Sequence, residues 1–132
     1  MVKAALRSLD TWIRTGDAPP EAPDLEVEVG PTGTAIVRDD DGIALGGIRL
    51  PQVEAPVVAL TGDAAPGSSV ICLLMGSTLP LAPGRLGELY PTADAYLDAF
   101  EQAADDAIDA GFVLADDREA LLAGADPSAI AG

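Results

Sequence analysis

The sequence contains no histidine, and this absence restricts the chemistry that the chain can perform alone. Histidine is the side chain most often used for general acid–base catalysis near neutral pH. A Ser-His-Asp triad therefore cannot be assembled within these 132 residues. The G-x-S-x-G turn that carries a nucleophilic serine is also missing, because the serines after Gly67 and Gly76 lack its flanking glycine pattern. We expect these serines in loops.

Cysteine, basic residues and aromatics are all scarce. Cys72 is the single cysteine, which excludes an intramolecular disulfide and a zinc site built on two thiolates, and its apolar neighbours favour a packed, inert thiol. Seven basic residues stand against 22 acidic ones, a formal charge of −15, and such a balance argues against nucleic-acid binding. With five aromatics, the core is expected to consist mainly of Leu, Ile, Val and Ala.

Long hydrophobic runs are missing as well. The longest, Val70 to Met75, is too short to span a bilayer, and charges interrupt the apolar residues near the start of the chain. We therefore expect a soluble, cytoplasmic chain without membrane contact or cofactor. Apolar residues still make up 48% of the sequence, so folded structure with an acidic surface is expected rather than disorder.

Periodicity predicts an α+β chain in three parts. Residues 1–16 carry apolar positions at three- and four-residue spacing and end at Gly16, which indicates an amphipathic helix with one face to bury. Residues 17–24 contain three prolines and form an extended connector. Residues 25–132 are expected to hold a mostly antiparallel β meander followed by helices.

Local signals place the elements of this last part. Strands are predicted at 25–29, 34–38, 48–50, 57–61 and 69–75, with a hairpin turn at Asp41-Gly42 and with Pro51 and Pro56 at strand ends or edges. A short turn around 85–89 precedes a helix capped by Thr92 and stopped by Gly111. The face that this helix should bury comprises Tyr96, Leu97, Phe100, Ala104, Ala107 and Ile108. A last helix is expected to open with Asp116 and Glu119 as a capping box and to bury Leu121 and Leu122.

Acidic clusters are the first candidates for chemistry. The run Asp39-Asp40-Asp41-Gly42 resembles part of a calcium loop, but Val37 and Ile48 then fall where oxygen ligands are required, so a solvated turn is the better interpretation. Carboxylate pairs such as Asp105 with Asp109 and Asp116 with Asp117 keep open a hydrolase that uses carboxylates only. In so acidic a chain, we interpret them as surface charge, and we predict no metal site.

Arg49 is the most specific candidate for a ligand or partner contact, together with Ser77 and Thr78. It lies in Gly46-Gly47-Ile48-Arg49-Leu50-Pro51, where glycines permit close backbone approach and a guanidinium could hold a carboxylate. Pairing with one of the chain's own acids is favoured over a ligand.

Several segments resemble, in order and spacing, the C-terminal part of the α/β-hydrolase-domain proteins, an esterase-like group. They are Ala5 to Ile13 with the break from Gly16 to Pro20, Gly46 to Pro51, Pro56 to Val58 with Thr61-Gly62, Gly76 to Thr78, Leu89 to Thr92 with Tyr96, and Ala110 to Leu114. The resemblance implies that the family's serine and histidine precede the segments matched here, so no catalytic residue is carried over. It also implies that residues 2–15 form a late helix of the hydrolase sheet and that residues from 25 onward form an extension over it.

Two functions follow from these observations. The first is a C-terminal portion of a hydrolase, noncatalytic on its own, that contributes scaffold or a wall of the substrate pocket. This function predicts an exposed apolar surface that would pack against the missing hydrolase core or cause self-association. The alternative is a standalone acidic binding module without enzymatic activity, which would have a closed core of its own.

Overall fold

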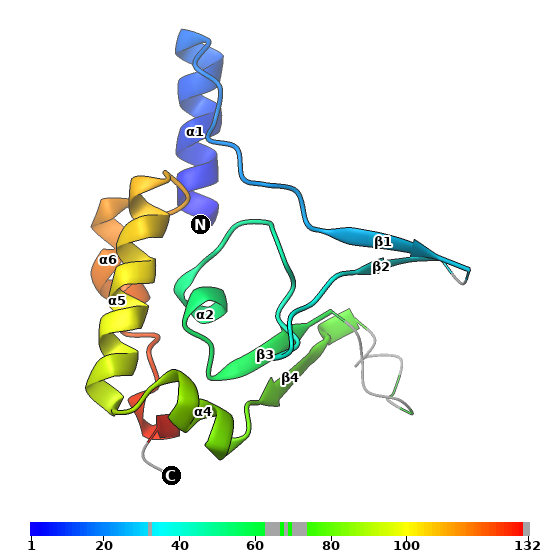
Figure 1. Cartoon of the computed structure of the whole chain (residues 1–132). Coiled ribbons are helices and arrows are strands. Elements are labelled where there is room, and N and C mark those ends of the chain that lie inside the picture. Colours follow the sequence, from blue (N-terminus) through cyan, green and yellow to red (C-terminus); the bar gives the residue numbers. More distant parts are fainter. Residues whose placement is uncertain (32, 63–66, 68, 70–73, 131–132) are drawn as a thin grey trace.

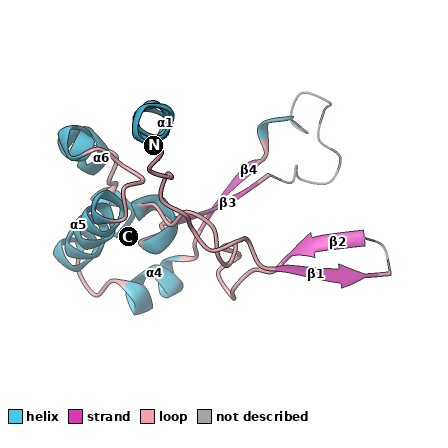
Figure 2. Ribbon diagram, turned by 90° about the horizontal axis from the view of Figure 1, so that it is seen from above, coloured by secondary structure: helices cyan, strands magenta, loops and turns pink. Residues whose placement is uncertain are grey.

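Helices gather on one side of the molecule, and two β-hairpins project from the other (Figure 1, Figure 2). The computed structural model describes residues 1–31, 33–62, 67, 69 and 74–130. Its secondary structure is mixed, with helices at both ends and antiparallel strands between them, so the predicted α+β class is confirmed. Among these residues, no helix is long and apolar enough to cross a membrane.

The first helix, α1 (Val2–Thr15), has the predicted bounds. It ends because Gly16 adopts a left-handed conformation, with φ 84°, and donates its backbone N–H to the carbonyl of Trp12 at 2.9 Å. The proline-rich connector that follows forms neither helix nor strand. The apolar face of α1, which the periodicity predicts to be buried against some surface, is not buried against the described chain.

The strands form two separate antiparallel pairs rather than one meander. In the first pair, β1 (Val27–Gly30) faces β2 (Gly33–Ile36), as the turn signal predicts. In the second pair, β3 (Val58–Thr61) faces β4 (Ser77–Pro80). The predicted turn at Asp41-Gly42 is present, closed by a single bridge between Arg38 and Ala44.

Two predictions in the middle of the chain are wrong. Residues 48–50 form no strand, and Pro51 begins the short helix α2 (Pro51–Glu54) instead of ending a strand. The reason is local: Gly46 and Gly47 have φ of 78° and 72°, which interrupts an extended run, and proline suits the first turn of a helix.

The strand expected at 69–75, with Cys72, falls largely outside the described residues. The strand that pairs with β3 begins at Ser77, so Ser77 lies in β4 and not in a loop as predicted, and Thr78 follows it in the same strand.

The C-terminal half is helical, as predicted. α4 (Pro83–Leu89) leads into α5 (Ala93–Asp109), where the Thr92 side chain accepts a hydrogen bond from the backbone N–H of Ala95 at 3.1 Å. Gly111, with φ 80°, follows the end of α5.

The last helix begins later than expected. A 3-10 turn (Ala115–Asp117) precedes α6 (Arg118–Leu122), and a second 3-10 turn (Pro127–Ile130) follows. The capping box predicted from Asp116 and Glu119 is wrong: α6 starts two residues later and has no side-chain cap hydrogen bond. Leu121 and Leu122 are partly buried, and Leu122 packs against the core.

The core lies where α5 packs against α2 and the last turn, which also contacts α4. Tyr96 and Phe100 are 1% and 2% exposed, and the cluster is completed by Ala55, Leu86 and Tyr90. Most buried residues are aliphatic, as expected, but the centre is aromatic: the Tyr90 and Tyr96 rings meet edge to face with centroids 5.2 Å apart. Within the predicted face of α5, Leu97 is 39% exposed and Ile108 is only partly buried, while Ala103, which was not predicted, is buried.

Candidate functional site

The side of α1 that carries its large apolar residues faces solvent. Leu6 is 62% exposed and Ile13 is 77% exposed, and Val2, Leu9 and Trp12 are exposed as well. These residues recur at helical spacing, so they form one stripe along α1. A contiguous apolar stripe of this kind is typical of a surface that contacts another protein surface.

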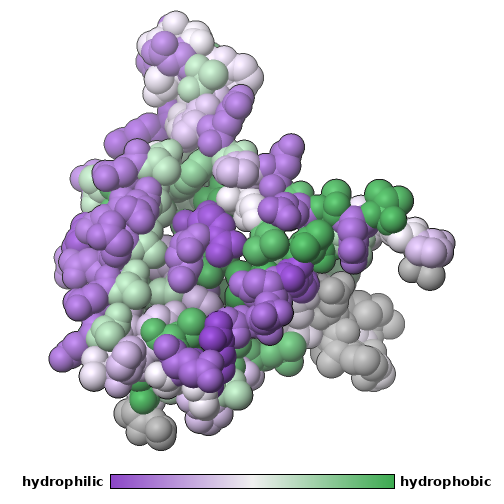
Figure 3. All heavy atoms as spheres, in the orientation of Figure 1, coloured by the Kyte–Doolittle hydropathy of each residue, from purple (hydrophilic) through white to green (hydrophobic). Residues whose placement is uncertain are grey.

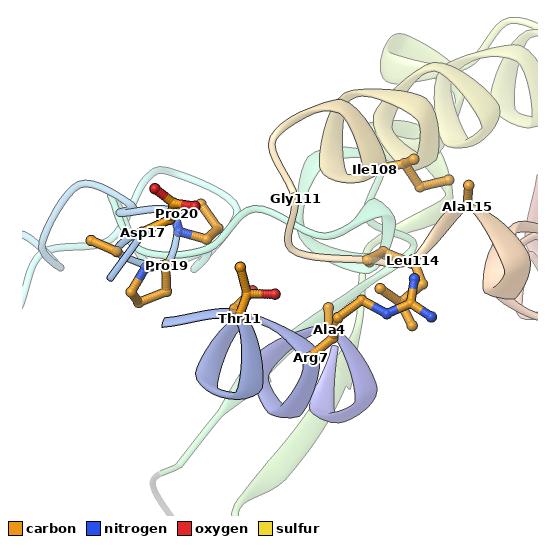
Figure 4. Close-up of a pocket in the computed structure, with 13 residues that line it drawn as sticks. Ala4, Arg7, Thr11, Asp17, Pro19, Pro20, Ile108, Gly111, Leu114 and Ala115 are labelled. Carbon is orange, nitrogen blue, oxygen red and sulfur yellow. The ribbon is translucent and has the colours of Figure 1, made fainter. Parts of the chain in front are cut away.

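The opposite side of α1 faces the rest of the chain through small and polar residues. Ala4 is the only residue of α1 that is buried, and Ser8, one turn later, is partly buried. Together with Arg7 and Thr11 they line a groove of about 360 Å³ (Figure 4). Across the groove lie Asp17, Ala18, Pro19 and Pro20 of the connector and Ile108, Gly111, Val113, Leu114 and Ala115 after the centre of α5. The helix therefore contacts its own chain through the side that the hydrophobic pattern would leave in water.

The first hairpin also lacks apolar cover from the described chain. Val27 stands opposite Ile36 in register, and both are exposed, as is Val29 on the same side of the strand. Figure 3 shows apolar surface gathered over this hairpin, in contrast to the polar surface over α5 and α6.

Arg49 lines a depression of about 250 Å³ between the segment after Gly47 and α5. Its Nε donates to the carboxylate of Glu54, and its Nη1 donates to the carbonyl of Ala44 at 2.8 Å. The guanidinium thus has an internal acid as partner, which is the pairing that the sequence favours. The close backbone approach predicted for the glycines also occurs, but with this chain's own backbone: a Cβ on Gly46 would lie 2.1 Å from the carbonyl oxygen of Asp24.

The structure does not bring the three predicted contact residues together. Ser77 and Thr78 are paired with Thr61 and Leu60 in the second hairpin, and neither lines the depression at Arg49. Their role as ligand or partner contacts remains a prediction.

Sequence reasoning missed a second ion pair of defined geometry. Arg85 donates to both carboxylate oxygens of Asp41, from Nε at 2.8 Å and from Nη2 at 2.9 Å, beside a depression of about 510 Å³. The hydrogen bonds from Arg85 hold the pKa of the Asp41 carboxyl below its usual range. The two residues are 44 positions apart, and no sequence spacing links them.

Two of the other acidic candidates form ion pairs at the surface. Asp105 accepts from Arg118 at 2.6 Å, which lowers the pKa of Asp105, and Asp117 pairs with Lys3. Asp39, in the predicted turn, accepts from the backbone N–H groups of Asp41 and Ile43. Across the described ranges, no cluster of acidic, cysteine or histidine side chains could hold a metal ion.

The phenol groups of the core are also shifted. Burial, with a smaller contribution from neighbouring Tyr96, raises the pKa of Tyr90 to about 12. Its hydroxyl donates to the carbonyl of Pro56 at 3.3 Å, so it links α4 to the start of the second hairpin. This position suits a structural role.

A family model described as an alpha/beta hydrolase domain matches residues 1–123. The chain belongs to the α/β-hydrolase domain family. Neither a curated protein nor a solved structure gives a match to it. The matched range runs from α1 through the end of α6, so the exposed stripe of α1 and the buried core lie in one hydrolase-domain segment. The resemblance stated from the sequence is confirmed.

Proposed function

We propose that the chain is a noncatalytic part of an α/β-hydrolase-domain protein and contributes scaffold or a wall of the substrate pocket to a catalytic core. The observation that carries this proposal is the inverted orientation of α1, with Ala4 buried in its own chain and Leu6 and Ile13 in solvent. A helix with a small face toward one neighbour and an apolar face toward solvent is suited to lie between two layers.

The size of the exposed stripe supports a stable contact. Burying a Leu, Ile or Val side chain fully contributes roughly 1.5–3 kcal/mol. Five apolar side chains of α1 are about half exposed or more. Covering them would therefore contribute several such increments, roughly 5 kcal/mol or more in gross terms before the costs of association are subtracted.

Two carboxylates with arginine partners support the noncatalytic part of the proposal. A glycosidase-like acid needs a carboxyl with a raised pKa. Asp41 and Asp105 have lowered pKa values instead, each because of an arginine partner. Their chemistry suits structural ion pairs.

The test is reconstitution of activity. A hydrolase-domain protein of this family, expressed without the segment that corresponds to residues 1–123, is expected to gain ester hydrolysis when this chain is added. The chain alone is expected to show no turnover. The double substitution Leu6→Gln, Ile13→Gln should abolish the gain, because it makes the stripe polar while glutamine preserves helix propensity.

A matched control comes from the same helix. Arg14→Gln changes an exposed residue that pairs with Asp10, outside the stripe, and should leave reconstitution intact. Ester turnover by the chain alone, or reconstitution that the double variant supports as well as the wild type, would refute the proposal.

The alternative, a standalone acidic binding module, is favoured by one observation. The cluster around Tyr96 and Phe100 is closed within the chain, and the Arg49 depression opens beside it. Under this proposal, Arg49→Ala removes binding of a carboxylate-bearing partner without changing the thermal melt. Unchanged binding would eliminate Arg49 as the contact.

A further inference from the structure

We infer that the groove between α1 and the end of α5 binds a small carboxylate with an apolar body, and that Arg7 holds the carboxylate. The groove has a volume of about 360 Å³, which lies at the lower end of the range of small-molecule sites. It lies on the side of α1 that faces its own chain, away from the exposed stripe. The site is therefore independent of the proposed scaffold contact.

Arg7 differs from every other basic residue of this acidic chain. The other six donate to partners within the protein: Lys3 to Asp117, Arg14 to Asp10, Arg38 to Gly42 and Thr61, Arg49 to Glu54, Arg85 to Asp41 and Glu88, and Arg118 to Asp105 and Glu101. Arg7 makes no hydrogen bond or ion pair with any residue that the structure describes. Arg7 is exposed to solvent and lines the groove, so its guanidinium is available to an anion that enters there.

The walls of the groove define the rest of the ligand. The Arg7 side chain extends toward Leu114, and Ile108 lies above it (Figure 4). Most of the lining is apolar, and Ser8 and Thr11 place hydroxyl groups on the same side of α1 as Arg7. A guanidinium next to apolar walls is suited to a carboxylate that carries a short hydrocarbon chain.

Asp17 sets the orientation of that ligand. It lines the end of the groove away from Arg7, and its carboxylate accepts a hydrogen bond from the Thr15 hydroxyl at 2.7 Å. Its negative charge repels an anion at that end. The carboxylate therefore binds at Arg7, and the hydrocarbon chain extends along Leu114 and Pro20.

The experiment is a titration of the full chain with hexanoate, followed by amide chemical shifts, with hexanol as the uncharged probe. Hexanoate is expected to shift the amides of Ser8, Thr11 and Leu114, and hexanol is expected to bind at least about tenfold more weakly, because it cannot form the charge-assisted pair. Arg7→Gln should weaken hexanoate binding to the level of hexanol. Asp17→Asn should strengthen hexanoate binding about twofold to threefold, because it removes the repulsion while the amide oxygen can still accept from Thr15.

Arg14→Gln is the matched control, since it removes an equal charge from the same helix outside the groove. Equal affinity for hexanoate and hexanol would overturn the inference, as would equal loss of binding in Arg7→Gln and Arg14→Gln. Shifts confined to residues outside the groove would overturn it too. A failure here leaves reconstitution through Leu6 and Ile13 unaffected, so the two proposals fail separately.

Discussion

Two helices of the molecule, α1 and α5, are both amphipathic, but they differ in how much of their apolar face is buried. α5 buries Tyr96, Phe100 and three alanines, whereas α1 buries Ala4 alone. The same contrast holds for the regions around them, because Ala4 is the one buried residue described before Ile43. A hydrophobic pattern predicts that one face of a helix is buried, but it does not identify the surface that buries it. The C-terminal region buries its apolar residues within the chain, and α1 leaves its apolar face in solvent.

The largest expected difference in the free energy of unfolding comes from replacing one aromatic residue in each region by alanine. Phe100→Ala should lower the free energy of unfolding by about 3–5 kcal/mol, because it leaves a cavity in the core. Trp12→Ala should change it by about 0.5 kcal/mol or less, because Trp12 is 50% exposed. Urea unfolding of both variants at low protein concentration measures the difference. Similar losses would mean that α1 packs against its own chain through its apolar face.

A smaller effect is expected at the start of the two helices. Thr92→Ala should cost about 1 kcal/mol, since it removes the side-chain cap of α5. Thr92→Ser keeps the oxygen and should restore most of the loss. α1 has no side-chain cap to lose. Thermal melts compare the variants, and an equal loss for alanine and serine would attribute the effect to the methyl group instead.

The ion pair of Asp41 with Arg85 should make a pH-dependent contribution to the free energy of unfolding. This contribution should be smaller than that of the Thr92 cap, because water screens a pair at the surface. A carboxyl whose pKa is lowered by folding stabilises the folded state above its ordinary pKa, near about 3.9, and loses this contribution as the pH falls through the lowered value. The difference in melting temperature between wild type and Asp41→Asn should therefore stay constant above about pH 5 and shrink as the pH falls below about 4, toward the lowered pKa. Asp10→Asn, in the exposed pair of α1, is the control variant. A gap that stays constant with pH would contradict this account.

The smallest effect on stability is expected for Leu6→Gln, Ile13→Gln, at about 0.5 kcal/mol or less, because both side chains already face solvent. The same variant should reduce self-association in sedimentation velocity and the binding of an apolar dye. A large loss of stability without a change in association would reverse the comparison between α1 and α5.

Local signals in the sequence predicted the two long helices, α1 and α5, well. Gly16, Thr92 and Gly111 act where they were expected, because a left-handed glycine and a capping hydroxyl depend only on neighbouring backbone. The first hairpin is correct for the same reason. The short helix α2 was missed because Gly46 and Gly47 were interpreted as a separator between strands and Pro51 as the end or edge of a strand.

Features that depend on distant residues could not be predicted in this way. The pairing of Asp41 with Arg85 and the packing of Pro20 near Gly111 join parts of the chain with no sequence relation. The available guanidinium of Arg7 is recognisable only after the partners of the other six basic residues are known. The sequence indicates only that such a residue would be unusual, because 22 acidic residues are available to pair with seven basic ones.

The way α1 is held has a mechanical consequence. Its one buried residue, Ala4, lies in the first turn. The later turns of α1 extend away from the other helices (Figure 1). A helix of 14 residues is about 20 Å long and bends little, so it behaves as a rigid arm fixed near one end. A rotation of about 10° at Ala4 displaces the far end by roughly 3 Å, about the width of one side chain. A small rotation about Ala4 is thereby magnified at Ile13.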